Sequence, residues 1–91
     1  MHYEWDPEKN RKNIDKHGIA FEAMSYWDWS LSLLLDVQVV SGEERELSVS
    51  PLTERLFAVV VTERGETLRV ISLRRATNAE IRAWRKEFQH G

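Results

Sequence analysis

The sequence predicts a single α+β domain over residues 1–91, in which an antiparallel β-sheet meander is backed by helices in the order β-α-α-β-β-β-β-α. Three observations lead to this fold class. The length of 91 residues fits one domain. Four successive segments between residues 31 and 73 carry strand patterns separated by turn signals. Both ends of the chain carry helix patterns with recognisable caps.

The N-terminal segment predicts a short strand over residues 2–5 and a helix over residues 7–17. Asp6 supplies a carboxylate that can cap the helix, and Pro7 stands at its first position, where a missing N–H costs nothing. Gly18 follows where a left-handed C-cap is needed. A capped helix therefore follows directly on the first strand.

The predicted helix is unusually polar on one face. Asn10, Asn13 and His17 share that face with Ile14, the helix's one aliphatic residue. Such a face must either form hydrogen bonds inside the protein or serve a surface site. For Asn13 we favour the structural role, in which its amide bridges backbone groups of a neighbouring segment.

The middle of the chain predicts a second short helix and four strands. Their expected ranges are 21–28 for the helix and 31–40, 45–50, 56–62 and 67–73 for the strands. Pro51 is expected to end the second of these strands. The third is apolar on both faces and is therefore expected to be central. Gly65 marks a hairpin turn between the last two.

The C-terminal segment predicts a helix over residues 78–88. Thr77 and Glu80 have the spacing of a capping box. Ile81, Trp84 and Phe88 form one apolar stripe, which is expected to face the sheet.

Composition excludes several classes of protein. The 42% apolar residues can form a core, which excludes a disordered chain. No apolar run approaches the roughly 20 residues of a membrane span, and the chain has no Cys for disulfides or thiol catalysis. A phosphate loop, a nucleophile elbow and a His pair at metal spacing are all missing, so we expect neither a cofactor nor a metal. A reducing cytoplasm is the default compartment.

Charge is unevenly distributed along the chain. Residues 22–54 hold seven acidic side chains and one basic, whereas residues 55–91 hold eight basic and four acidic. The net charge of −2 at pH 7 argues against a protein that coats nucleic acid non-specifically. The two segments predict either two surfaces for two partners or an ordinary mixed surface.

The candidate functional residues are mostly basic. They are His17, Lys16, Arg45, Arg69, Arg74, Arg75 and Glu80. Arg69 lies between apolar strand residues, and Arg74 and Arg75 end that strand just before a helix N-terminus. Guanidinium groups on a concave sheet face beside a helix start can bind a phosphate. Alternatively, these arginines pair at the surface with Glu63, Glu66 or Glu80.

Five motifs in order along the chain resemble the BrnT toxin family. They are Asp6-Pro7-x-Lys9-x-x-x-Asn13-x-x-Lys16-His17-Gly18, Phe21-Glu22-Ala23, Gly42-Glu43-Glu44-Arg45, Thr62-Glu63-Arg64-Gly65, and Arg69-Val70-Ile71-Ser72-x-Arg74-Arg75-Ala76-Thr77-x-x-Glu80. The resemblance implies a RelE-like fold and a cytoplasmic ribonuclease of a type II toxin–antitoxin system that halts translation. It also implies a BrnA-like antitoxin with a ribbon-helix-helix domain, through which the pair would bind operator DNA and repress its own operon.

Metal-free cleavage of RNA needs a proton-transfer group and positive charge at the phosphate. His17 or Glu80 could transfer the proton. His17 is favoured because an unperturbed histidine has a pKa of about 6.5. Arg45, Arg69 and Arg75 would supply the catalytic charge, while Lys16, Arg64 and Arg74 would bind RNA. His17 could equally be a cation that caps the helix C-terminus.

The alternative hypothesis is a non-catalytic partner-binding or co-repressor module. Trp27 and Trp29, together with the acidic segment, could bind a basic, apolar segment of a partner, because such aromatic residues often anchor interfaces. The competing interpretation places both rings in the core.

Overall fold

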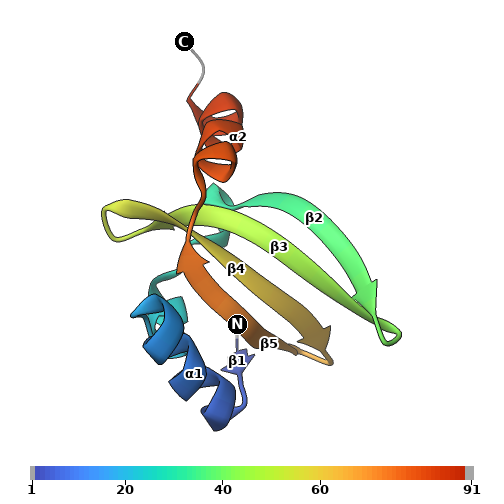
Figure 1. Cartoon of the computed structure of the whole chain (residues 1–91). Coiled ribbons are helices and arrows are strands. Elements are labelled where there is room, and N and C mark those ends of the chain that lie inside the picture. Colours follow the sequence, from blue (N-terminus) through green and yellow to red (C-terminus); the bar gives the residue numbers. More distant parts are fainter. Residues whose placement is uncertain (1, 90–91) are drawn as a thin grey trace.

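The computed structural model describes residues 2–89, in which two helices and two short 3-10 helices accompany a five-stranded sheet (Figure 1). The elements in chain order are β1 (His2–Glu4), α1 (Pro7–His17), η1 (Phe21–Tyr26), η2 (Trp29–Leu31), β2 (Leu33–Val40), β3 (Glu43–Leu52), β4 (Arg55–Arg64), β5 (Thr67–Arg75) and α2 (Asn78–Phe88). The strand order is β1-β5-β4-β3-β2. This confirms the predicted α+β class, with β4 at the centre of the sheet.

The sheet is mixed rather than purely antiparallel. Strands β2 to β5 form the predicted antiparallel meander. Strand β1 adds to the outer edge of β5 in parallel, pairing His2 with Thr67 and Glu4 with Arg69. Helix α1 follows β1 directly, so the N-terminal strand and helix both lie along β5.

Two predicted boundaries differ from the structure. The helix expected over 21–28 is replaced by η1 and η2, and Asp28 caps η2 by accepting a hydrogen bond from the Ser30 N–H at 3.0 Å. Pro51 does not end its strand, because β3 continues to Leu52. Pairing with β2 stops at Val49, so Pro51 lies where β3 has one neighbour only and its missing N–H breaks no ladder.

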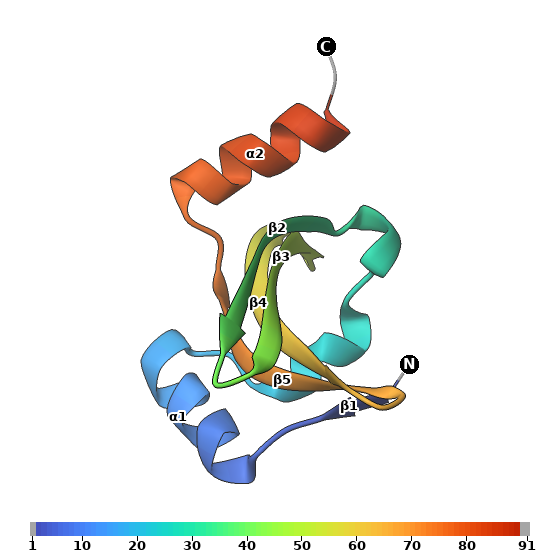
Figure 2. The same ribbon diagram turned by 90° about the vertical axis from the view of Figure 1, so that its right-hand side faces the viewer.

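Each face of the sheet carries its own apolar cluster. The larger one joins η1 to one face and has a buried centre of Phe21, Met24, Trp27, Leu52, Val59, Val61, Val70 and Leu73. The smaller one lies on the opposite face, where Trp84 and the partly buried Phe88 of α2 pack against Val49 and Ala58. Figure 2 shows α2 and the 3-10 helices on different sides of the sheet, with α1 beside β5. Since α2 contacts only part of its face, the rest of that face remains open.

Asn13 joins α1 to β5, as the sequence predicted. Its Nδ2 donates to the carbonyl oxygens of Ile19 (2.9 Å) and Leu73 (2.8 Å), and its Oδ1 accepts from the Leu73 N–H (3.2 Å). Beyond the end of β1 this edge of β5 has no strand partner, so the Asn13 amide takes the place of one. Asn10 accepts a hydrogen bond from the Phe21 N–H at 2.8 Å and so fixes the start of η1.

No helix among residues 2–89 combines the length and apolar character needed to span a membrane.

Candidate functional site

A bulge in β5 decides which arginines share a face of the sheet. Val60 pairs with Ser72 but Val61 pairs with Val70, so Ile71 is an extra residue. Strict alternation would place Arg69 and Arg75 on one face. The bulge shifts that alternation, and Val70 and Leu73, three positions apart, both point into the larger apolar cluster. Arg74 therefore joins Arg69 on the opposite, open face, and Arg75 does not.

Arg45 and Arg74 line a hollow of about 290 Å³ on the open face. Leu47, Val60 and Ile71 contribute its apolar surface, and β2 closes one side. The Nε atom of Arg45 is buried there and has no hydrogen-bond partner among residues 2–89. A buried guanidinium donor without a partner is costly, so this hollow is suited to an anionic ligand.

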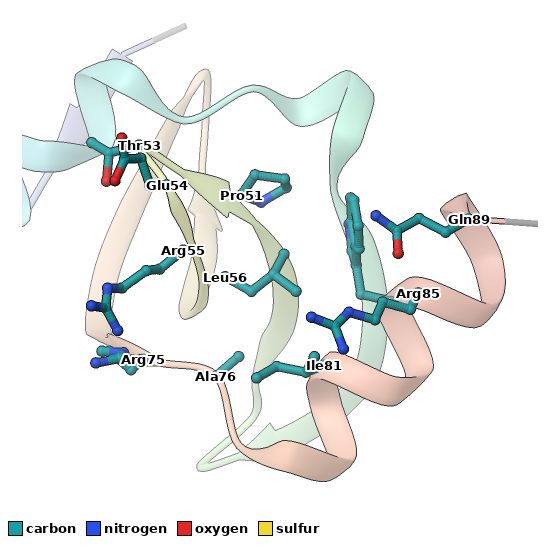
Figure 3. A pocket seen from close by; sticks show the side chains of 11 residues that line it. Pro51, Thr53, Glu54, Arg55, Leu56, Arg75, Ala76, Ile81, Arg85 and Gln89 are labelled. Carbon is teal, nitrogen blue, oxygen red and sulfur yellow. The ribbon is translucent and has the colours of Figure 1, made fainter.

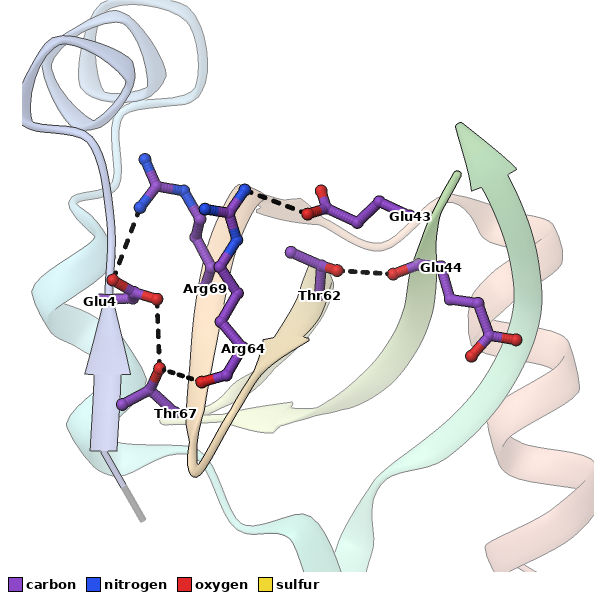
Figure 4. Close-up of polar contacts among 7 residues, drawn as sticks. All are labelled: Glu4, Glu43, Glu44, Thr62, Arg64, Thr67 and Arg69. Atoms are coloured by element: carbon purple, nitrogen blue, oxygen red, sulfur yellow. Dashed lines mark hydrogen bonds and ion pairs between the residues drawn. The ribbon is translucent and has the colours of Figure 1, made fainter. Parts of the chain in front are cut away.

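Arg69 lies farther along the same face. It pairs across the sheet with Thr62, whose hydroxyl donates to the Glu44 carbonyl oxygen at 2.7 Å (Figure 4). The Arg69 Nη1 is 3.6 Å from the Glu4 Oε2 and the side chain keeps 25% exposure. This ion pair is partly open to solvent, so a phosphate can compete for the guanidinium.

Arg64 stands at the end of this face. Its Nη2 donates to the Glu43 Oε2 at 3.0 Å, and both side chains are well exposed (Figure 4). Arg69 therefore pairs with Glu4 and not with the expected Glu63 or Glu66, while Arg64 pairs with Glu43. Neither pair is buried, so both guanidinium groups remain accessible to an anionic ligand.

Arg74 is held by Glu80 in a bidentate ion pair. Its Nη1 and Nη2 donate to the two carboxylate oxygens at 2.8 and 3.0 Å. The Glu80 Oε1 also accepts from the Thr77 N–H at 2.8 Å, which completes the predicted capping box. The hydrogen bond from Arg74 is the main reason that the pKa of Glu80 is lowered. Glu80 therefore stays anionic and orients Arg74, which makes it a poor proton donor and leaves His17 as the better proton-transfer group.

His17 lies in a second hollow, of about 220 Å³, between α1 and β5. Three lysines line it with His17: Lys9, Lys12 and Lys16. Ile71 lines this hollow and the Arg45–Arg74 hollow alike, so the two are neighbours. Sequence reasoning missed Lys9 and Lys12, although Lys12 lies three residues after Lys9 and four before Lys16, which places all three on one helical face.

The environment of His17 favours its neutral form. Burial is the largest cause that lowers the His17 pKa from its ordinary value, followed by the positive charges of Lys16 and Arg74. A histidine with a pKa below its ordinary value is largely neutral at pH 7 and can accept a proton. The same shift argues against a role as a helix-capping cation.

Arg75 lies in a different part of the molecule from Arg69. It lines a hollow of about 380 Å³ between the β3–β4 turn and α2, together with Arg55 and Arg85 (Figure 3). The floor of that hollow is apolar, and Arg55 lies beside Arg75 at one end. The structure thus separates Arg75 from the other arginines of the predicted catalytic set.

Trp27 belongs to the core, whereas Trp29 is only partly buried. Trp27 is only 7% exposed and lies within the larger apolar cluster. Trp29 packs against the same cluster, and its Nε1 donates to the Tyr3 hydroxyl at 2.7 Å. Burial in the core does not favour the expected partner-binding role of Trp27. Trp29 also lines a surface hollow with Glu46 and Glu63, so its partner-binding role stays a prediction.

Metal-binding side chains are dispersed in the described part of the chain. Among residues 2–89, no three His, Asp or Glu side chains come close enough together to hold a metal ion.

Comparison with known proteins agrees with this architecture. The family model described as "Ribonuclease toxin, BrnT, of type II toxin-antitoxin system" matches residues 5–80. The crystal structure of the Brucella abortus ribonuclease toxin BrnT is similar in fold, with a TM-score of 0.68 at 24% sequence identity over 86% of this chain and 100% of that chain. No curated protein matches the sequence.

Proposed function

The chain belongs to the BrnT family of ribonuclease toxins of type II toxin–antitoxin systems, and from this premise we propose that its open sheet face cleaves RNA without a metal ion. One observation carries the proposal: the β5 bulge puts Arg74 on the face that also carries Arg69 and Arg45, next to a hollow that contains a neutral His17. Three cations beside a proton acceptor meet the main requirements of phosphodiester cleavage.

In the proposed reaction the RNA 2′ oxygen attacks the adjacent phosphorus. The bond between the 2′ oxygen and phosphorus forms while the bond between phosphorus and the 5′ oxygen breaks. His17 accepts the 2′-hydroxyl proton, and the 5′ oxygen takes a proton from water as it leaves. The products are a 2′,3′-cyclic phosphate and a 5′-hydroxyl. Arg45, Arg69 and Arg74 stabilise the extra negative charge of the transition state, which makes a metal ion unnecessary.

The remaining residues have supporting roles in this proposal. Glu80 positions Arg74 through the bidentate ion pair. Lys16, together with Lys9 and Lys12, binds phosphates of the incoming strand, and Arg64 extends this contact along the sheet. Arg75 is left outside the catalytic group because it lines another hollow.

Membership of a type II toxin–antitoxin family implies an antitoxin partner. We propose that this partner is BrnA-like, with a ribbon-helix-helix domain that carries the operator DNA contacts, and that the complex represses its own operon. Inhibition of translation places the protein in the cytoplasm.

The decisive experiment follows mRNA integrity in a cell-free translation mix after addition of the purified, antitoxin-free protein. That mix contains free and ribosome-bound message, so a requirement for ribosomes cannot hide the activity. Arg69→Ala is expected to lower cleavage by about 10²- to 10³-fold, as for the loss of a donor that stabilises a transition state. Arg82→Ala, an exposed arginine on α2, is the matched control and should cleave like the wild type. Where the purified protein cleaves free RNA, that cleavage should persist in EDTA.

Arg75→Ala tests whether Arg75 belongs to the catalytic group, as the sequence led us to expect, or lies outside it, as we now propose. We expect it to retain cleavage, because the Arg75 side chain lies away from the open face. Loss of cleavage in this folded variant would return Arg75 to the catalytic group. Intact message with the folded wild type and every variant would instead support the non-catalytic binding module.

A further inference from the structure

Strand β2 is an open edge of the sheet with an unusually apolar exterior. Four of the seven large apolar side chains that are exposed among residues 2–89 belong to it: Leu34, Val37, Val39 and Val40. Val39 is 68% exposed. Long, apolar edge strands expose unpaired backbone groups and readily pair with another strand.

The opposite edge of the sheet is protected. There β1 is only three residues long, and Asn13 of α1 satisfies the backbone of β5 at Leu73. By contrast, β2 is the last strand in the sheet order and runs for eight residues. An extended segment could therefore add to β2 over most of that length.

The apolar side chains of β2 are flanked by carboxylates. Leu34, Val37 and Val39 pair with Ser48, Glu46 and Glu44 of β3 and therefore lie on the same face as those residues. Glu43, Glu44, Glu46 and Glu63 also line one acidic hollow at this end of the sheet. A segment that adds to β2 would place its side chains beside both the valines and these carboxylates.

Charge decides against a second copy of the chain as the occupant. Pairing of β2 with itself would place Asp36 of the two copies on adjacent strands, where like charges are destabilising. The complementary occupant is an extended segment that combines apolar and basic side chains. Its apolar residues would cover Val37 and Val39, while its basic residues would reach Glu44 and Glu46.

We propose that β2 is the docking edge for the antitoxin, which adds a basic, apolar strand to the toxin sheet. This proposal rests on the proposed function in one respect, the identification of the partner as an antitoxin. Binding at this edge lies across the sheet from α1 and does not require the antitoxin to contact His17.

Hydrogen–deuterium exchange provides the direct test, with the purified cognate antitoxin as the probe. Amides in residues 33–40 should become protected when the antitoxin binds wild-type toxin, because a new strand pairs with their free side. Binding affinity is measured for two double variants: Val37→Thr with Val39→Thr, and Glu44→Lys with Glu46→Lys. Each is expected to weaken binding at least about tenfold, because the first makes the docking surface more polar and the second repels the basic side chains of the antitoxin.

Matched control variants carry the same kinds of substitution at exposed positions outside β2 and β3. Ile14→Thr removes an exposed aliphatic side chain from α1, and Glu66→Lys with Glu87→Lys reverses two exposed carboxylates. Both controls should bind the antitoxin like the wild type. Absence of protection at residues 33–40, or equal loss of affinity in controls and β2 variants, would overturn the proposal.

Two further results have distinct meanings. Protection of residues 33–40 that rises with toxin concentration alone, with a dimer in sedimentation, would make a second copy the occupant and overturn the proposal. RNA cleavage is measured separately on the same wild-type sample. A toxin that binds through β2 but cleaves no RNA would leave the docking proposal standing while the proposed function fails.

Discussion

His17 lies at the end of helix α1, in an environment that lowers its pKa. Burial against its neighbours is the main cause of its lowered pKa, and the positive charges of Lys16 and Arg74 add to that effect. The sequence could identify His17 as a candidate but could not show Arg74 nearby, because that contact depends on how α1 docks against β5. Residue-scale chemistry here follows from tertiary packing.

The pH dependence of cleavage tests the role of His17. A proton acceptor must be neutral, and the lowered pKa of His17 keeps it neutral at pH 7. Cleavage should therefore fall only as the pH drops below about 6.5, through the lowered pKa. Lys16→Gln removes one cause of the lowered His17 pKa. The acid limb of the pH profile, where cleavage falls with falling pH, should therefore move to higher pH. The quantity compared between variants is the pH at which this limb lies, not the maximal rate of cleavage. Lys86→Gln on α2 should leave it unmoved, and an identical limb in the Lys16 variant would contradict the assignment.

Arg74 and Arg75 illustrate the limit of residue patterns. Both were identifiable as basic residues at the end of a strand, but strict alternation along β5 would put Arg75 on the face of Arg69. The extra residue Ile71 reverses that assignment. A bulge of this kind depends on pairing with β4 and on the burial of both Val70 and Leu73, so the local sequence carries no clear signal for it.

At the scale of elements, the sequence predicted helix ends correctly, because capping depends on residues that are close together in the chain. The Asp6 cap, the left-handed Gly18 and the Thr77–Glu80 capping box all occur where the sequence predicted them. The parallel placement of β1 and the continuation of β3 through Pro51 depend on which strands are neighbours. Those features require the sheet order, which periodicity alone does not specify.

The junction of α1 with β5 rests on one buried amide. Asn13→Ala would remove three hydrogen bonds and leave the N–H and C=O of Leu73 without their side-chain partner. We expect the free energy of unfolding to fall by about 3 kcal/mol, because each unsatisfied buried group costs roughly 1–3 kcal/mol. Urea unfolding followed by tryptophan fluorescence measures the change. Asn78→Ala, at an exposed position on α2, is the matched control and should stay within about 0.5 kcal/mol of the wild type. Equal stabilities of the two variants would refute the role of Asn13.

At the scale of the whole molecule, charge segregation matters more than the net charge of −2. The acidic segment is concentrated at the β2–β3 end, whereas Lys9, Lys12 and Lys16 gather with His17 between α1 and β5. A protein of this charge can therefore attract RNA to one side and a basic partner to the other. The sequence revealed the two charged segments, and the fold determined which surfaces they form.

The salt dependence of RNA binding tests this segregation. A 2′-O-methyl RNA, which lacks the attacking hydroxyl, is titrated by fluorescence anisotropy at several KCl concentrations. For single strands the slope of log affinity against log salt concentration changes by about 0.7 for each phosphate contact. Lys12→Gln with Lys16→Gln should therefore reduce the magnitude of the slope by about 1.4. Arg82→Gln with Lys86→Gln removes the same charge from exposed positions on α2 and should change the slope little. If both double variants reduce the slope equally, net charge rather than the α1 surface governs RNA binding, and the lysines of α1 lose their proposed role.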